Sequence, residues 1–157
     1  MVTLKIFRAI LLISLGILTG LEFCSTYCVH NAFYDLDNQT YIPIRQALDR
    51  TFTPVMANFL LLTGVLLFIN LFTVKKKISY EFLLFLLAFL FFESGFLITI
   101  FGNVPINISI DKMNPLSPPI YITEIREKWN LLNTYRTWTS LFGYTFFCSA
   151  IFAKPSY

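Results

Sequence analysis

The chain has 157 residues, of which 56% are hydrophobic and only 13% are charged. A soluble domain is typically about a quarter charged, so this composition excludes an ordinary soluble globular protein and indicates a membrane protein. The net charge is +3, and the sequence contains no basic patch that would predict nucleic-acid binding. We therefore expect the lipid bilayer, and not nucleic acid, to be the main partner of this chain.

Four apolar stretches are long enough to cross a bilayer, because about 20 apolar residues in an α-helix span a hydrocarbon core of roughly 30 Å. We predict an all-α membrane protein, a bundle of four transmembrane helices that forms a single domain over residues 1–157. The predicted spans cover residues 6–28, 52–74, 80–101 and 132–153. The first apolar run continues past the usual length of a signal peptide, and no small-residue cleavage site follows it, so we expect it to be retained.

Basic residues in short flanks predict the orientation of the spans, because they favour the cytoplasmic side of the membrane. They precede the first span, join the second span to the third and follow the fourth: Lys5, Arg8, Lys75, Lys76, Lys77 and Lys154. We therefore predict a multi-pass protein of the bacterial inner membrane with both termini in the cytoplasm. The loops at residues 29–51 and 102–131 would then face outward.

The two outer loops differ in their sequence patterns. In the first loop, DNQTYIPIRQALDR places Tyr41, Ile44 and Leu48 on one side at helical spacing, which predicts a short amphipathic helix at the membrane interface. Thr40 or Asn38 would cap this helix. The second loop contains the turn-forming stretches NVPIN and NPLSPP, and its end, TEIREKW, returns to a helical pattern that leads into the fourth span.

Polar residues in the spans fall at a similar depth. At a rise of about 1.5 Å per residue, Glu93 lies roughly 12 Å below the outer end of its span, and Glu22 and Asn58 lie roughly 9 Å below theirs. Asn133 and Arg136 enter from the outer end of the fourth span. An ionised carboxylate in lipid costs at least a few kcal/mol and needs a partner. We therefore predict that these side chains meet inside the bundle, with Arg136 as the partner of the glutamates.

This cluster has a functional and a structural interpretation. Two carboxylates facing one arginine leave an excess negative charge, so one of them would hold a proton, and such a carboxyl suits general acid–base chemistry. Trp129, Asn133, Arg136 and Ser140 share one helical face. Asn133 and Arg136 would donate to a carbonyl or phenolate oxygen, and Trp129 would anchor the helix at the interface or wall an aromatic ligand. In the structural interpretation, the cluster only fixes the helix register.

Residues for metal or redox sites are scarce. His30 is the only histidine, which excludes multi-histidine metal sites and a bis-histidine haem within this chain, and we expect it in a solvated loop. Cys24 and Cys28 are four residues apart, which does not match the redox spacing C-x-x-C. We expect these cysteines and Cys148 to be small buried residues, and we predict no metal and no cofactor.

Several motifs together resemble a known family. They are GILTG in the first span, Gln46 before the second, NVPIN after the third and W-N-x-x-N-x-x-R at the start of the fourth. This pattern resembles the anthrone-oxygenase-like family of small four-span membrane proteins. The resemblance is most specific at Asn103, Pro105, Asn107, Trp129, Asn133 and Arg136. It implies the four-span fold, and its fungal members named for the function oxidise polyketide anthrones to anthraquinones without a metal or flavin.

The sequence therefore favours a cofactor-independent oxygenase or oxidoreductase. Its substrate would be a hydrophobic, aromatic or quinol-like small molecule bound in a pocket in the outer half of the bundle. Glu93 or Glu22 would act as the base, although neither is carried over from the family, and Arg136 would stabilise the developing anion. The residues expected to bind substrate are Asn58, Asn103, Asn107, Trp129 and Asn133.

A non-enzymatic function is the alternative. The chain would then be a small membrane binding or assembly subunit whose polar cluster is structural. A transporter is a weaker interpretation, because polar groups confined to one half of a small bundle form no continuous path unless the protein assembles as a homo-oligomer. The sequence leaves that assembly open.

The predicted orientation can be tested with a fusion reporter. A reporter joined after Tyr157 should report a cytoplasmic location, because the basic flanks all fall on the side that carries the C-terminus. A second reporter inserted in the loop at residues 114–119 serves as the matched external control. An external signal from the C-terminal fusion would overturn the predicted topology.

Overall fold

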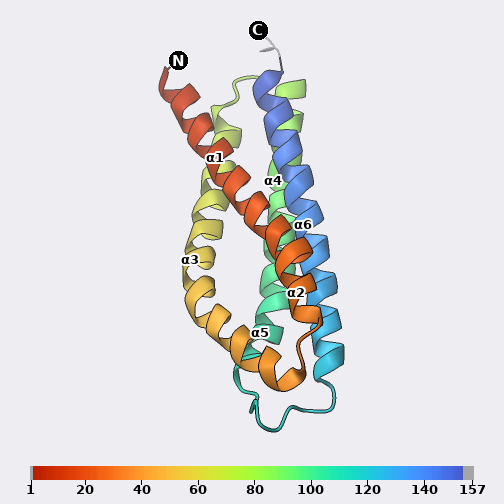
Figure 1. Ribbon diagram of the computed structural model, residues 1–157. Helices are drawn as coiled ribbons and strands as arrows, with labels where there is room; N and C mark the ends of the chain where they lie inside the picture. The colour runs from red at the N-terminus through yellow and green to blue at the C-terminus, as the bar shows by residue number, and fades with distance from the viewer. Residues whose placement is uncertain (1, 154–157) are drawn as a thin grey trace.

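The computed structural model describes residues 2–153, which are almost entirely helical. Four long rods follow one another along the chain (Figure 1). The first rod consists of α1 (Val2–Cys24), the π-helical turn η1 (Ser25–Val29) and α2 (His30–Tyr34). The second is α3 (Asn38–Thr73), and the third consists of α4 (Tyr80–Ile98), the π-helical turn η2 (Thr99–Asn103) and α5 (Val104–Asp111). The fourth is α6 (Ile122–Phe152), and this arrangement confirms the all-α fold.

Three of the rods are long and apolar enough to cross a membrane, namely residues Val2–Tyr34, Asn38–Thr73 and Tyr80–Asp111. Among the described helices, α6 does not reach the same apolar character, because its inward face carries Thr, Ser, Asn and Arg side chains in place of Leu. The apolar rods therefore support integration in a membrane, whereas a fourth crossing by α6 stays a prediction.

The rods pack as a bundle with a hydrophobic cluster near each end. Both ends of the chain and the turn between α3 and α4 lie at one end of the bundle, and the loop between α5 and α6 lies at the other (Figure 1). Leu11, Leu67, Phe85 and Phe147 belong to the cluster on the side of the termini. Tyr41, Ile42, Ile110, Ile122 and Trp129 belong to the cluster at the opposite end.

Helix α3 differs from the predicted interfacial helix and separate span. It runs without a break from Asn38 to Thr73, and Asp37 caps it by accepting a hydrogen bond from the Thr40 backbone N–H at 2.9 Å. Its first turns bury Tyr41, Arg45 and Asp49 against the bundle, so they do not present an apolar face to a membrane surface. The structure therefore does not show a separate short amphipathic helix, and its predicted caps, Thr40 or Asn38, are wrong because Asp37 caps α3.

The stretch NVPIN is helical and not a turn. Asn103 ends the π-helical turn η2, and Pro105 lies in the first turn of α5, where the missing N–H costs no intrahelical hydrogen bond. Asn103 and Asn107 are four residues apart, so they lie on the same side of one continuous rod. The neighbouring stretch NPLSPP does form the loop before α6, as predicted.

Close packing in this bundle is concentrated between α4 and α6. A Cβ atom at Gly143 of α6 would lie 3.3 Å from the backbone oxygen of Ala88, so the two helices approach each other closely at this point. In the GILTG motif, a Cβ at Gly16 would lie 3.6 Å from the Tyr144 ring, whereas Gly20 has no atom within 4 Å of that position. Of the two glycines of the motif, Gly16 therefore lies against α6 and Gly20 does not.

This contact predicts a selective loss of stability. Gly143→Leu should lower the free energy of unfolding by about 1–3 kcal/mol or more, because a larger side chain meets rigid backbone of α4. Gly20→Leu is the matched control and should be nearly neutral, since its position is open. The measurement is the fraction of monodisperse protein left after heating in detergent. Equal losses for the two variants would contradict the packing.

Candidate functional site

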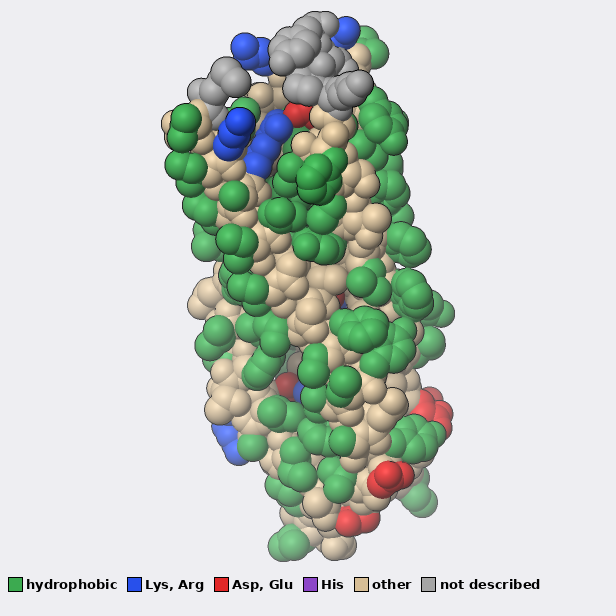
Figure 2. Space-filling view, turned by 45° about the horizontal axis from the view of Figure 1, so that its top comes forward, with side chains coloured by type: hydrophobic (Ala, Val, Ile, Leu, Met, Phe, Trp, Pro, Cys, Tyr) green, Lys and Arg blue, Asp and Glu red, His purple; other side chains and the backbone are tan. Residues whose placement is uncertain are grey.

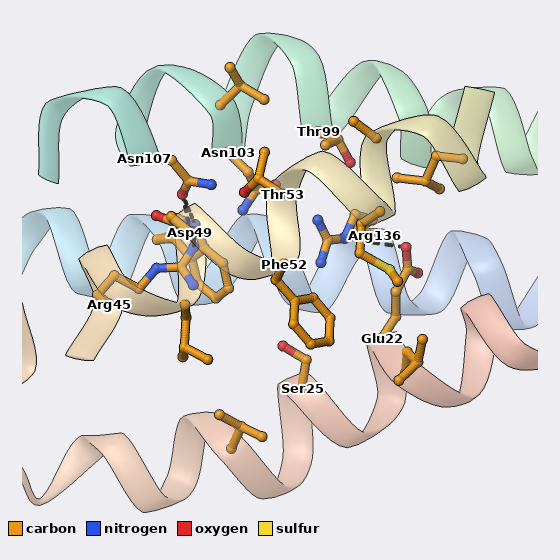
Figure 3. Close-up of a pocket in the computed structure, with 18 of the residues that line it drawn as sticks. Glu22, Ser25, Arg45, Asp49, Phe52, Thr53, Thr99, Asn103, Asn107 and Arg136 are labelled. Carbon is orange, nitrogen blue, oxygen red and sulfur yellow. Dashed lines mark hydrogen bonds and ion pairs between the residues drawn. The ribbon is translucent and has the colours of Figure 1, made fainter. Parts of the chain in front are cut away.

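A pocket of about 240 Å³ lies in the half of the bundle away from the termini. Residues of all four rods line it, with the third rod along the upper edge of the close-up, the first rod along the lower edge and α6 behind (Figure 3). In the space-filling view, acidic and basic atoms are visible at the base of openings between hydrophobic side chains (Figure 2). Its apolar walls include Leu18, Val29, Phe33, Leu48, Met56 and Leu60, and its charged and amide side chains are Glu22, Arg45, Asp49, Asn103, Asn107 and Arg136.

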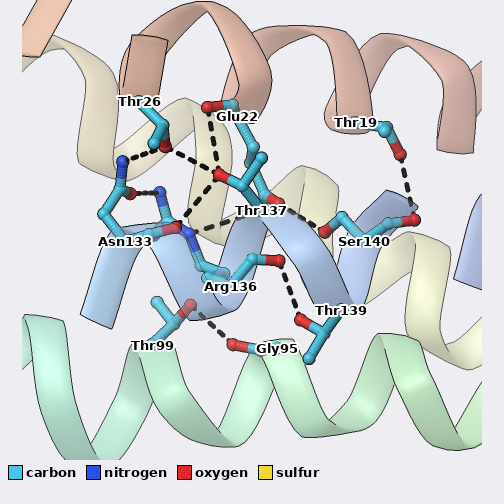
Figure 4. A network of polar contacts seen from close by, with 10 residues as sticks. All are labelled: Thr19, Glu22, Thr26, Gly95, Thr99, Asn133, Arg136, Thr137, Thr139 and Ser140. Carbon is cyan, nitrogen blue, oxygen red and sulfur yellow. Dashed lines mark hydrogen bonds and ion pairs between the residues drawn. The ribbon is translucent and has the colours of Figure 1, made fainter. Parts of the chain in front are cut away.

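One end of the pocket is built around the guanidinium of Arg136. Its Nε atom lies 3.5 Å from the Glu22 carboxylate, and its Nη2 atom donates a hydrogen bond to Asn133 Oδ1 at 2.5 Å (Figure 4). Ser140 donates a hydrogen bond to the other Glu22 oxygen. Helix α6 supplies Asn133, Arg136 and Ser140 from one face, as its spacing predicts. The expected pairing of a glutamate with Arg136 is therefore present, with Glu22 as the partner.

Hydroxyl and amide groups hold this end of the pocket rigidly. Asn133 is fully buried and donates to Thr26 Oγ1 at 2.6 Å, and the hydroxyls of Thr26 and Thr137 lie 2.7 Å apart (Figure 4). Thr137 also reaches the Glu22 backbone oxygen at 3.3 Å. These bonds join the first rod to α6. Asn133 does not line the pocket, so in this structure it orients Arg136 and has no direct access to a ligand.

The structure places Glu93 away from Arg136. Glu93 lines a separate groove of about 260 Å³ between α3 and α4, beside Leu61, Val65 and Phe68. Gly64 leaves room for its carboxylate, since a Cβ there would lie 3.0 Å from Glu93 Oε1. Gly95, two residues further on, faces α6, and two residues turn a helix by about 200°. The expected pairing of Glu93 with Arg136 is therefore wrong. Glu93 lies at a similar depth, but on a different face of α4 from the one that meets α6.

Asn58 is also remote from the pocket. Its side chain is exposed and donates a hydrogen bond at 3.0 Å to the backbone oxygen of Pro54 in its own helix. That oxygen lies in the turn that contains a proline, where a local side-chain donor is a common partner. The structure therefore gives Asn58 a local role in α3, and the expectation that it points into the bundle is wrong.

The opposite end of the pocket is a polar cluster that the sequence reading missed. Arg45 and Asp49 of α3 form a buried ion pair with 3.0 Å between Nη2 and Oδ1. Asn107 Oδ1 accepts hydrogen bonds from Arg45 at 2.9 Å and from the Trp129 indole at 2.7 Å. The Trp129 ring lies 4.2 Å from the Arg45 guanidinium. The ion pair could have been predicted from the i,i+4 spacing of Arg45 and Asp49 in the sequence, because residues at this spacing are neighbours on a helix.

His30 completes this end and differs from its predicted setting. It lies in α2 and not in a solvated loop, and its ring stacks on Trp129 with 4.3 Å between the ring centres. Its Nδ1–H donates to the Ser25 backbone oxygen at 2.9 Å, which fixes the ring. Cys24 and Cys28 are exposed, so the prediction that they are buried is also wrong. Among residues 2–153, no three His, Cys, Asp or Glu side chains are grouped to hold a metal ion.

Several polar atoms of the pocket residues have no protein partner. Both amide atoms of Asn103, which is 1% exposed, are buried without a hydrogen bond, and so are Asp49 Oδ2 and Arg45 Nε. A buried polar atom without a partner costs about 1–3 kcal/mol. Arg136 Nε is likewise buried without a hydrogen bond, so four residues around one cavity carry this cost together. The arrangement is therefore suited to a ligand that supplies both donors and acceptors.

The Glu22–Arg136 pair can be tested by its effect on stability. Glu22→Gln should lower the free energy of unfolding by about 3–5 kcal/mol, because it leaves a buried guanidinium without its counter-ion. The double variant with Arg136→Gln should recover part of this loss. Glu124→Gln, at an exposed site of α6, is the control. The free energies can be measured by denaturation in detergent, and strictly additive effects would contradict a direct pair.

Comparison with known proteins agrees with the resemblance seen in the sequence. The model of the anthrone oxygenase family matches residues 46–146, which is more than half of the chain. No curated protein and no solved structure matches the chain significantly. The matched segment contains Asp49, Asn103, Asn107, Trp129 and Arg136, whereas Glu22 precedes it. The chain belongs to the anthrone oxygenase family.

Proposed function

We propose that this protein is an oxygenase that oxidises a hydrophobic, aromatic or quinol-like molecule with molecular oxygen, without a metal or flavin. The observation that carries the proposal is the guanidinium of Arg136, which lines a pocket with apolar walls and is held by Glu22 and Asn133. A fixed cation in a dry cavity stabilises negative charge that develops on a bound molecule. Family membership supports the reaction class.

The reaction can be written for an anthrone. A base removes a proton from the methylene carbon, and the electron pair that remains is shared with the carbonyl oxygen, where Arg136 stabilises the negative charge. The carbanion reduces oxygen and forms a carbon–oxygen bond, which gives a hydroperoxide. Loss of a second proton from that carbon and cleavage of the O–O bond then release water. One oxygen atom enters the anthraquinone and the other leaves as water, so the substrate itself supplies the electrons.

The walls and the mouth of the pocket suit a hydrophobic substrate. Leu21 and Phe52 line the pocket and are also exposed, at 36% and 49%, so the opening lies between α1 and α3. These helices belong to rods that are apolar enough to lie in a membrane. A substrate dissolved in the bilayer could therefore enter from the side, and Trp129 offers an aromatic surface inside.

The structural alternative makes a different prediction about Arg136. The hydrogen bonds among Thr26, Asn133 and Thr137 are the kind that a purely structural cluster would contain. A subunit of this type would lose stability when the cluster is altered but would have no chemistry to lose. The ligand-facing position of Arg136 favours the enzyme, and turnover distinguishes the two.

Oxygen consumption with a panel of anthrones and quinols tests the proposal. The purified protein should consume oxygen, and with an anthrone as substrate ¹⁸O₂ should leave one labelled atom in the anthraquinone product. Arg136→Gln should lower kcat/KM by about 10²–10³-fold, the usual effect of removing one group that stabilises an oxyanion.

Arg50→Gln, which changes an exposed arginine of α3, is the matched control and should retain wild-type rates. Each variant is compared only after its elution and melting show a folded protein. A folded wild-type protein that consumes no oxygen with any member of the panel would refute the oxygenase.

A further inference from the structure

We infer that Asp49 is the base of this pocket and that Arg45 and Asp49 form a second polar subsite opposite Arg136. The substrate class that fits is a fused or single aromatic ring with an oxygen function at one edge and an acidic C–H or O–H group at the opposite edge. This inference rests on the proposed function and assigns a residue to its first step.

The two carboxylates of the pocket differ in how many of their oxygens are free. Glu22 Oε2 accepts a hydrogen bond from Ser140, and Glu22 Oε1 is held in the ion pair with Arg136 at 3.5 Å, without a hydrogen bond. Asp49 uses only Oδ1, which faces Arg45 at 3.0 Å, and its Oδ2 is buried without a partner. A base needs a free lone pair within reach of the substrate proton. Asp49 lines the pocket and keeps one oxygen with neither a hydrogen bond nor an ion pair, whereas Glu22 serves as the counter-ion of Arg136.

The surroundings of Asp49 fix its ion pair in place. Arg45 is held from two sides, by the hydrogen bond to Asn107 and by the face of the Trp129 ring. Trp129 is itself fixed by its hydrogen bond to Asn107 and by the stacked His30 ring. The Arg45 guanidinium therefore cannot move to pair with Asp49 Oδ2 without breaking these contacts. This oxygen is left for a ligand.

The two ends of the pocket lie on either side of one cavity. In the close-up, Arg45 and Asp49 stand at one end, Glu22 and Arg136 at the other, and Phe52 between them (Figure 3). Asn103, with both amide atoms unpartnered, lies along the same wall. A conjugated ring transmits charge from one edge to the other. Removal of a proton beside Asp49 would therefore place negative charge on an oxygen beside Arg136.

The proton and electron balance of the step is simple. Asp49 Oδ2 takes the proton as the methylene C–H bond of an anthrone breaks, and the electron pair stays on the substrate as an enolate. Molecular oxygen, the oxidant of the proposed reaction, later accepts the electrons. The proton on Asp49 returns to the oxygen that leaves as water. Asp49 is thus a carboxylate again at the end of each turnover.

Hydrogen exchange without oxygen isolates this step from the oxidation. Under anaerobic conditions in D₂O, the wild-type protein should accelerate exchange of the methylene protons of anthrone above the buffer rate. Asp49→Asn should lower this acceleration by about 10²–10⁴-fold, the range for loss of a general base. Asp35→Asn, at an exposed site after α2, is the matched control and should exchange at the wild-type rate.

Binding shows whether the altered pocket is still formed. Trp129 lines the pocket and Trp138 is 48% exposed, so Trp138→Phe leaves one tryptophan that reports the ligand. Quenching of Trp129 by anthraquinone should give a Kd for Asp49→Asn within about threefold of the parent. If the unpaired Arg45 prevents folding, the double variant Arg45→Gln, Asp49→Asn removes both charges and is measured in its place.

The outcomes separate the base from the oxygenase. Exchange that depends on Asp49, with or without oxygen consumption, supports the assignment. Oxygen consumption together with exchange that is unchanged in a folded Asp49→Asn protein overturns the assignment and leaves the proposed function intact. Exchange without oxygen consumption refutes the oxygenase and keeps the base. A wild-type protein that neither exchanges nor oxidises anthrones or quinols overturns both.

Discussion

The guanidinium of Arg136 has to be neutralised and hydrogen-bonded inside an apolar bundle, and much of the structure serves that requirement. Glu22 supplies the charge from the first rod, and Asn133 supplies an acceptor from the same helix. Thr26 accepts a hydrogen bond from Asn133, and its hydroxyl lies against that of Thr137. These contacts fix Asn133, which in turn fixes Arg136. A lone charge at this depth would cost several kcal/mol, so these contacts are a condition for folding as well as for any chemistry.

The charged residues of the pocket form two ion pairs, because each buried charge needs a partner. Each arginine has one carboxylate: the Glu22–Arg136 pair joins the first rod to α6, whereas Arg45 and Asp49 both belong to α3. The pairs differ because Ser140 donates a hydrogen bond to the second oxygen of Glu22, while Asp49 Oδ2 has no partner among residues 2–153. One pair can therefore hold a fixed positive charge, and the other can exchange a proton. Hydrophobic walls between them separate the two tasks in space.

Periodicity predicted some helical faces well and others poorly. Helix α6 mixes polar and apolar residues, so the spacing of Trp129, Asn133, Arg136 and Ser140 identified its inward face. Helix α4 is apolar on all sides, so its sequence does not show which face points inward. The rise per residue therefore predicted the depth of Glu93 but not the direction in which its side chain points. Arg45 and Asp49 were overlooked because a charged pair in a polar stretch resembles a solvated surface until its burial is known.

The chain alone established that this is an apolar helical protein, that Arg136 needs an acidic partner and which face of α6 is polar. Composition and spacing carry this information, because they act within one helix. Packing decided the rest: that Glu22 and not Glu93 meets Arg136, that α3 continues inward from Asn38, and that Asp49 and Asn107 share a pocket with Trp129. These are contacts between helices, whose rotation about their axes is set by neighbours and close approaches such as Gly143.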